Sequence, residues 1–76
     1  MNYEKKIHPR AGTRLKRLRK SRGMTQEQLG EHLGVKKAAI SKYENHTREL
    51  NSSTIFRLAE IFKVDPGYFL NSKEPE

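Results

Sequence analysis

The sequence contains no cysteine and no tryptophan. Without cysteine, neither a disulfide framework nor a thiolate metal site can stabilise the fold. No apolar run approaches the roughly 18 residues that span a bilayer, and no signal-peptide core follows the N-terminal charges. We therefore expect a cytoplasmic protein without a membrane segment.

Groups that could support catalysis or metal binding are also scarce. The chain has 76 residues, the size of one domain, and a domain this short leaves no room for a large enclosed active site. Its histidines, His8, His32 and His46, lie far apart, and no cysteine or carboxylate accompanies them at metal-ligand spacing. Ser41 has no histidine partner at predictable reach. The sequence therefore predicts no enzyme, no metal site and no cofactor.

Positive charge, in contrast, is abundant. The net charge is +7, and residues 1–22, 23–46 and 47–76 contribute +8, 0 and −1. The first helix and the arm before it are therefore the expected electrostatic footprint, and a polyanion is the natural partner. A membrane surface is disfavoured, because the basic face lacks the aromatic and leucine stripe of an interfacial helix.

Hydrophobic periodicity predicts helices throughout residues 9–70, with a flexible basic arm at 1–8 and a polar tail or linker at 71–76. Pro9 suits the first position of a helix, and Gly23 suits its end. The core stripe of this helix is Ala11, Leu15 and Leu18, at spacings i, i+4 and i+7. The side chains expected to point outward are Arg14, Arg17 and Lys20.

Residues 25–45 predict two short helices joined by a tight turn. Thr25 is a suitable N-cap, and Gln28 completes a capping box. Gly34 can supply the positive φ that ends the first helix, and the second is expected over about 36–45. Its outward arc holds Lys37, Ala38, Ser41, Lys42 and Asn45.

This outward arc suits the major groove of DNA. Its geometry nominates as base-reading residues Lys37, Ala38, Ser41 and Lys42. A lysine can donate to guanine O6 and N7, and the methyl group of Ala38 can contact a thymine methyl. The alternative for each lysine is phosphate neutralisation without sequence reading.

The C-terminal third predicts a polar loop and two further helices. Asn51, Ser52 and Ser53 offer alternative N-caps for the fourth helix. The core stripe of that helix is Ile55, Leu58, Ala59 and Phe62. Asp65 and Pro66 then begin a short fifth helix. Its apolar residues, which either close the core or form a dimer surface, are Tyr68, Phe69 and Leu70.

Over residues 11–70 the chain resembles the Cro/CI-like (Xre family) helix-turn-helix domains of phage repressors. The matching motif positions are Gln26, Leu29, Gly30, Leu33, Gly34, Val35, Ile40 and Tyr43, together with Arg19, Glu44 and the block 55–64. The resemblance implies an all-α, compact five-helix bundle of the lambda-repressor-like type. Many members have alanine at the position of Gly30, where glycine should cost about 0.5–1 kcal/mol of helix stability, and proline at that of Leu50.

The resemblance also implies roles for individual residues. Base reading falls to the positions of Lys37, Ala38 and Lys42, with Asn45 at the helix end. Gln26 corresponds to the phosphate anchor, and a structural ion pair is implied between Arg19 and Glu44. Further phosphate candidates are Thr25, Lys36, Asn45, Thr47 and Arg48.

These features together predict a sequence-specific regulator that binds double-stranded DNA, namely a phage or bacterial repressor acting as a homodimer on a palindromic operator. The alternative is an antitoxin-like or other protein-interaction module that uses the end at residues 68–70, with secondary DNA binding. The charged tail could also lead to a further C-terminal domain or protein partner. A non-specific nucleoid or RNA binder is disfavoured, because no aromatic stacking platform accompanies the cations.

Overall fold

The computed structural model describes residues 10–70, which fold into five α-helices without a β-strand. They are α1 (Ala11–Ser21), α2 (Gln26–Leu33), α3 (Lys37–Glu44), α4 (Ser52–Phe62) and α5 (Gly67–Leu70). The predicted all-α architecture is confirmed. Within the described range no helix is both long and apolar enough to cross a bilayer. Pro9, the arm at 1–8 (with His8) and the tail at 71–76 lie outside the described residues.

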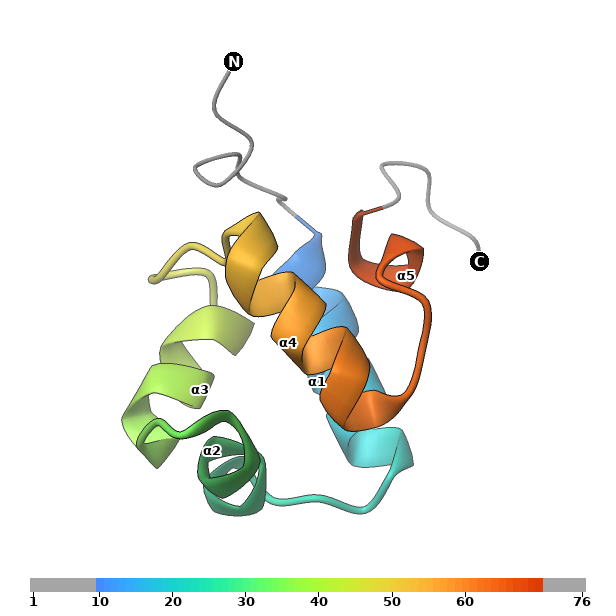
Figure 1. Ribbon diagram of the computed structural model, residues 1–76. Helices are drawn as coiled ribbons and strands as arrows, with labels where there is room; N and C mark the ends of the chain where they lie inside the picture. Colours follow the sequence, from blue (N-terminus) through green and yellow to red (C-terminus); the bar gives the residue numbers. More distant parts are fainter. Residues whose placement is uncertain (1–9, 71–76) are drawn as a thin grey trace.

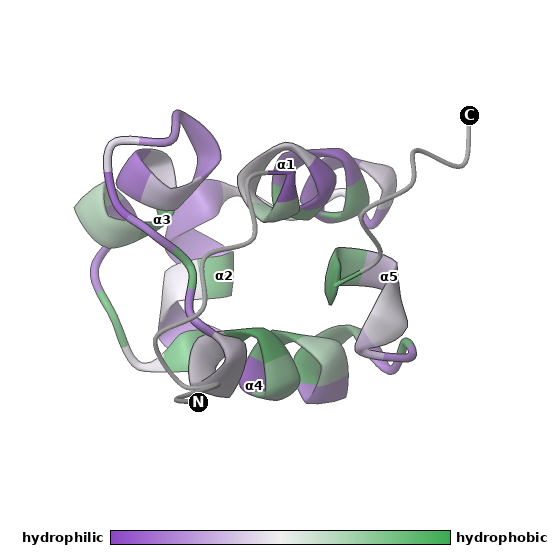
Figure 2. Cartoon of the chain, turned by 90° about the horizontal axis from the view of Figure 1, so that it is seen from above, coloured by the Kyte–Doolittle hydropathy of each residue, from purple (hydrophilic) through white to green (hydrophobic). Residues whose placement is uncertain are grey.

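The helices surround one core. α1 and α4 lie on opposite sides of it, α2 and α3 form one end, and α5 forms the other (Figure 1 and Figure 2). The hydrophobic side of α4 faces inward in Figure 2. Residues that contribute buried side chains to this core include Leu15, Leu18, Leu29, Leu33, Ile40, Ile55, Leu58, Phe62 and Phe69. α3 is thus held at the surface, at the end of the molecule away from α5.

Short-range hydrogen bonds begin the helices where the sequence indicated. Thr25 Oγ1 accepts from the Gln28 backbone N–H at 3.0 Å, and Gln28 Oε1 accepts from the Thr25 N–H at 2.9 Å, so the capping box is present. Of the three candidate caps before α4, Asn51 is used. Asp65 Oδ1 accepts from the Gly67 N–H at 2.7 Å before α5. The predicted ends of the second helix, 36 and 45, are the caps of α3.

Arg14 corrects one prediction, because its side chain does not point outward. It is only 1% exposed. The reason is tertiary: α5 packs against α1 and covers this side of the helix, and the Tyr68 hydroxyl donates to the Arg14 carbonyl oxygen at 3.4 Å. Arg17 and Lys20 are exposed, as predicted.

Two glycines lie where helices approach closely. A Cβ on Gly12 would lie 2.2 Å from the carbonyl oxygen of Tyr43, so α1 and α3 touch through their backbones. A Cβ on Gly30 would lie 2.6 Å from the carbonyl oxygen of Val35. Gly30 was expected only to lower helix stability relative to alanine. The structure adds an opposing contribution, because an alanine methyl at this position would have to displace the turn that joins α2 to α3.

Candidate nucleic-acid interface

The turn between α2 and α3 fixes how the second of these helices is presented. The N–H groups of Gly34 and Val35 both donate to the carbonyl oxygen of Gly30, at 2.8 and 2.9 Å. Gly34 has φ +82°, in the left-handed region that favours glycine. Leu33 and Ile40 are buried on the inner sides of the two helices. The turn and these buried side chains therefore fix the orientation of α3 relative to α2.

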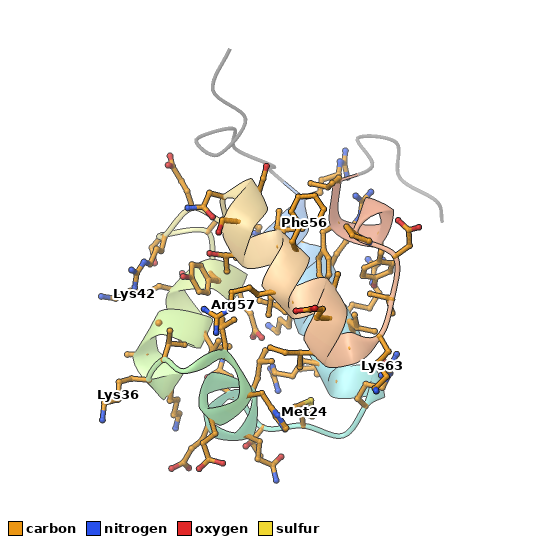
Figure 3. All side chains as sticks on the ribbon, viewed as in Figure 1. Met24, Lys36, Lys42, Phe56, Arg57 and Lys63 are labelled. Atoms are coloured by element: carbon orange, nitrogen blue, oxygen red, sulfur yellow. The ribbon has the colours of Figure 1, made fainter. Side chains whose placement is uncertain are left out.

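The outward face of α3 is polar and basic. Lys37, Ala38 and Lys42 are exposed, whereas Ser41 is half-buried. Figure 3 shows Lys42, and Lys36 at the start of the helix, pointing away from the bundle. The structure thus places three of the four predicted base-reading residues on one accessible surface, with Ser41 less accessible than expected.

Glu44, the last residue of α3, is at the centre of a buried polar network. Its Oε2 accepts from Arg19 Nε at 2.6 Å and its Oε1 accepts from Arg19 Nη2 at 3.1 Å, with side-chain exposures of 9% for Arg19 and 3% for Glu44. Arg19 Nη1 also donates to the Met24 carbonyl oxygen at 2.7 Å. The ion pair implied by the family resemblance is present, and it links α1, the segment before α2 and the end of α3.

The same carboxylate holds Gln26. Gln26 Nε2 donates to Glu44 Oε1 at 3.0 Å, from the first position of α2. A carboxylate only accepts, so the atom facing it is the amide nitrogen, whose second N–H can donate to a further acceptor. Thr25, beside it, is exposed. The start of α2 and the end of α3 are therefore held together on one side of the molecule.

A second set of hydrogen bonds closes the C-terminal end of α3. Asn45 Oδ1 accepts from the Thr47 backbone N–H at 3.2 Å and from Thr47 Oγ1 at 2.7 Å. The N–H groups of Thr47 and Arg48 both donate to the Lys42 carbonyl oxygen, at 3.0 and 3.1 Å. The Arg48 guanidinium lies over the Tyr43 ring, 5.5 Å from its centroid. Three residues predicted to contact phosphate, Asn45, Thr47 and Arg48, thus pack against the C-terminal end of α3.

Sequence reasoning missed a further contact at this end. His46 has φ +68°, unusual for a non-glycine residue, and its Nε2 lies 3.1 Å from Thr13 Oγ1 of α1. This contact lies beside Gly12, since the same ring is 3.3 Å from the position of a Cβ there. The one available signal was position, because left-handed residues commonly follow helix ends.

Two groups of exposed cations lie on and beside α1 and α3, and Arg57 and Lys63 are exposed on α4 and at its C-cap. Arg14 and Arg19 of α1 are buried, while Lys16, Arg17 and Lys20 are exposed on that helix. Exposed cations on α3, at its start and in the loop after it are Lys36, Lys37, Lys42 and Arg48. With its exposed caps Arg10 and Arg22, α1 carries five exposed cations, and α3 with its flanking residues carries four.

The proposed dimer surface is only partly available. Phe69 is 1% exposed and belongs to the core, so of the two roles considered for the fifth helix this residue takes core closure. Tyr68 and Leu70 are half-buried and pack against the hydrophobic core. Among the described residues the exposed large hydrophobic side chain is Phe56, at 51%. Sequence reasoning did not single it out, although it lies outside the core stripe of α4.

Solved structures with this arrangement include a repressor bound to an operator and a controller protein. The P22 c2 repressor, solved in complex with a synthetic operator, superposes with a TM-score of 0.72 and 30% identity over 83% of this chain and 96% of that one. The restriction-modification controller protein C.AhdI from Aeromonas hydrophila gives a TM-score of 0.73 and 26% identity over 80% of this chain and 88% of its own.

Proteins with similar sequences include HTH-type transcriptional regulators. An uncharacterized HTH-type transcriptional regulator from Sinorhizobium medicae is 36% identical over 76% of this chain and 42% of its own length. The HTH-type transcriptional regulator ImmR of Bacillus subtilis is 32% identical over 83% of this chain and 50% of its own. The chain therefore spans about half the length of these relatives. Residues 15–69 match the family described as helix-turn-helix, and the chain belongs to that family.

Proposed function

We propose that this chain is a sequence-specific transcriptional regulator that binds double-stranded DNA by inserting α3 into the major groove. The observation that carries the proposal is the outward face of α3, where exposed lysines flank the methyl group of Ala38. The buried Arg19–Glu44 ion pair holds this helix in place from its inner side. Base edges and phosphates present acceptors to such a face. The relatives named as transcriptional regulators support the same function.

The residues divide into two roles. Base reading is assigned to Lys37, Ala38, Lys42 and Ser41, of which Ser41 is half-buried. Phosphate contacts are assigned to Thr25, Gln26, Lys36, Asn45 and Arg48. Thr47 is left out of this set, because its N–H and its hydroxyl already donate to Asn45 Oδ1. These two groups lie at the start of α2, on α3 and in the loop after it, which matches the way a helix-turn-helix places backbone contacts around the groove.

We propose further that the regulator is a repressor of phage or bacterial type, which works as a homodimer on a palindromic operator. One such domain covers only a half-site, and two-fold dimers place recognition helices about 34–36 Å apart. Binding alone can exclude a polymerase from a promoter. Tyr68 and Leu70 remain partly accessible for a dimer contact, whereas Phe69 is committed to the core.

Salt dependence tests the proposal. If each subunit neutralises about 4–5 phosphates, the logarithm of the association constant for duplex DNA should fall with the logarithm of salt concentration with a slope near −4 per subunit. Titration of an operator selected from random duplexes, in parallel with a scrambled duplex, measures this slope and the specificity. Absence of affinity for any duplex, even in dilute buffer, would refute the proposal.

The alternative is a protein-interaction module of antitoxin type. It would depend on apolar side chains at the end of the chain, and burial of Phe69 leaves less apolar surface there than the sequence suggested. Apolar association should be insensitive to salt, whereas DNA binding should weaken steeply as salt rises. The titration therefore separates the two functions.

A further inference from the structure

The hydrogen-bonding polarity of the α3 surface restricts which bases it can read. We infer that the half-site is recognised through guanine and thymine edges, because this surface offers donors and a methyl group but hardly any free acceptor. The inference rests on the proposed function and adds to it the chemistry of the DNA sequence. Three sets of side chains carry the inference, namely the lysines, Asn45 and Glu44.

Asn45 is fixed as a donor. A backbone N–H can only donate, so the Asn45 atom that meets the Thr47 N–H at 3.2 Å must be the carbonyl Oδ1. The Thr47 hydroxyl donates to the same oxygen at 2.7 Å. Both lone pairs of Oδ1 are thereby used, and the amide N–H groups are what Asn45 can offer to DNA.

The one acid of α3 is similarly engaged. Glu44 Oε1 accepts from both Arg19 and Gln26, Oε2 accepts from Arg19, and the side chain is 3% exposed. It therefore offers no carboxylate oxygen to the groove. Lys37 and Lys42 carry ammonium groups, which only donate. Ser41 is the exception, but its hydroxyl is half-buried and can donate as readily as accept.

The four bases differ in what they present to such a surface. In the major groove guanine shows two acceptors, and thymine shows an acceptor and a methyl group. Cytosine presents an amino group alone, and adenine presents an amino group beside a single acceptor, N7. The amino groups need a protein acceptor, the amide oxygen of asparagine or glutamine for adenine and a carboxylate for cytosine, so a donor surface can contact adenine only at N7 and cannot distinguish it there from guanine. The donors of α3 fit guanine, and the methyl of Ala38 fits thymine.

Base analogues test this inference directly, with the full chain and an operator obtained by selection from random duplex DNA. Removing guanine N7 with 7-deazaguanine, or the thymine methyl with uracil, should each weaken binding by about 10-fold, the equivalent of 1.4 kcal/mol. Replacing adenine by 7-deazaadenine should change binding by less than about 2-fold. A larger loss with 7-deazaadenine than with 7-deazaguanine would overturn the inference.

The substitution Asn45→Asp tests the contribution of the Asn45 amide N–H groups, because it replaces them with an oxygen. Aspartate keeps an oxygen for the two Thr47 bonds, so the thermal midpoint should be unchanged, but the outward amide becomes a second acceptor. Binding should fall at least about 10-fold, and any base preference at the pair it faces should move towards cytosine. Ser53→Asp, on exposed α4 surface, makes the same charge change and is the control. Equal affinities of the two variants would overturn the inference.

Asn45→Ala identifies the acceptor that receives the amide. Loss of preference at one guanine pair assigns it to a base, and uniform weakening of all sequences assigns it to a phosphate oxygen; both are acceptors, as inferred. Loss of a preference for adenine over guanine at one pair, which needs the occupied Oδ1 to face the adenine amino group, would contradict it. If the wild-type chain binds no duplex at all, the proposed function fails instead, so the two failures are distinguishable.

Discussion

Arg19 of α1 and Glu44 of α3 form a buried ion pair with Nε and Oε2 2.6 Å apart. The pair joins the C-terminal half of α1 to the last residue of α3, across 25 residues of sequence. Because the same carboxylate also receives the Gln26 amide, one side chain sets the relative positions of α1, α2 and α3.

Removal of the carboxylate should therefore destabilise the fold. Glu44→Ala leaves the Arg19 guanidinium buried without its partner, and we expect a loss of about 1–3 kcal/mol in the free energy of unfolding. Urea unfolding measures it. Glu60→Ala, an exposed glutamate on α4, is the control and should change stability by less than about 0.5 kcal/mol. An unchanged midpoint for Glu44→Ala would mean that the pair contributes nothing.

The contact between α1 and α3 gives a second stability prediction. In Gly12→Ala the new methyl group would lie 2.2 Å from the Tyr43 carbonyl oxygen, so the helices must separate. We expect a loss of about 1–3 kcal/mol, the usual range for overpacking, despite the higher helix propensity of alanine. Thermal unfolding against Lys16→Ala, an exposed site on the same helix, provides the comparison. A variant at least as stable as the wild type would show that this close approach is not required.

The predictable and unpredictable parts of this structure differ in the range of the interactions behind them. The Thr25 capping box, the Gly34 turn and the core stripe of α4 depend on residues within one or two helical turns, so sequence spacing was sufficient. Burial of Arg14 and Phe69 depends on α5 packing against α1, which no local pattern encodes.

Contacts between helices were equally impossible to predict from local sequence patterns. The His46–Thr13 contact and the tight fit at Gly12 require the position of α3 relative to α1, and neither residue type signals it. The Arg19–Glu44 pair has the same long-range character and was reached only through the family resemblance, because nothing in the spacing of the two residues links them. The outward residues of α3, in contrast, follow from helical periodicity alone.

Gln26 should contribute affinity without sequence preference. Gln26→Ala removes an amide held between Glu44 and the proposed phosphate, so binding to selected and scrambled duplexes should weaken by the same factor. Fluorescence anisotropy with both duplexes measures it. Gln28→Ala is the matched control, because this glutamine is used in the capping box and should leave affinity unchanged while the protein is folded. A change in the selected sequence would assign Gln26 to base reading instead.

Lys42 should behave differently, because it lies on the exposed face of α3 (Figure 3). Lys42→Ala should cost about 1–3 kcal/mol for the selected operator and relax the preference at one base pair, while affinity for scrambled DNA falls less. Lys63→Asn removes the same charge from the C-cap of α4, where φ is +58° and asparagine is tolerated. Lys63 lies on the side of the molecule away from Lys36 and Lys42 in Figure 3, so this variant should retain the full specificity. If Lys42→Ala weakens both duplexes equally, Lys42 neutralises a phosphate and the base-reading surface of α3 is smaller than proposed.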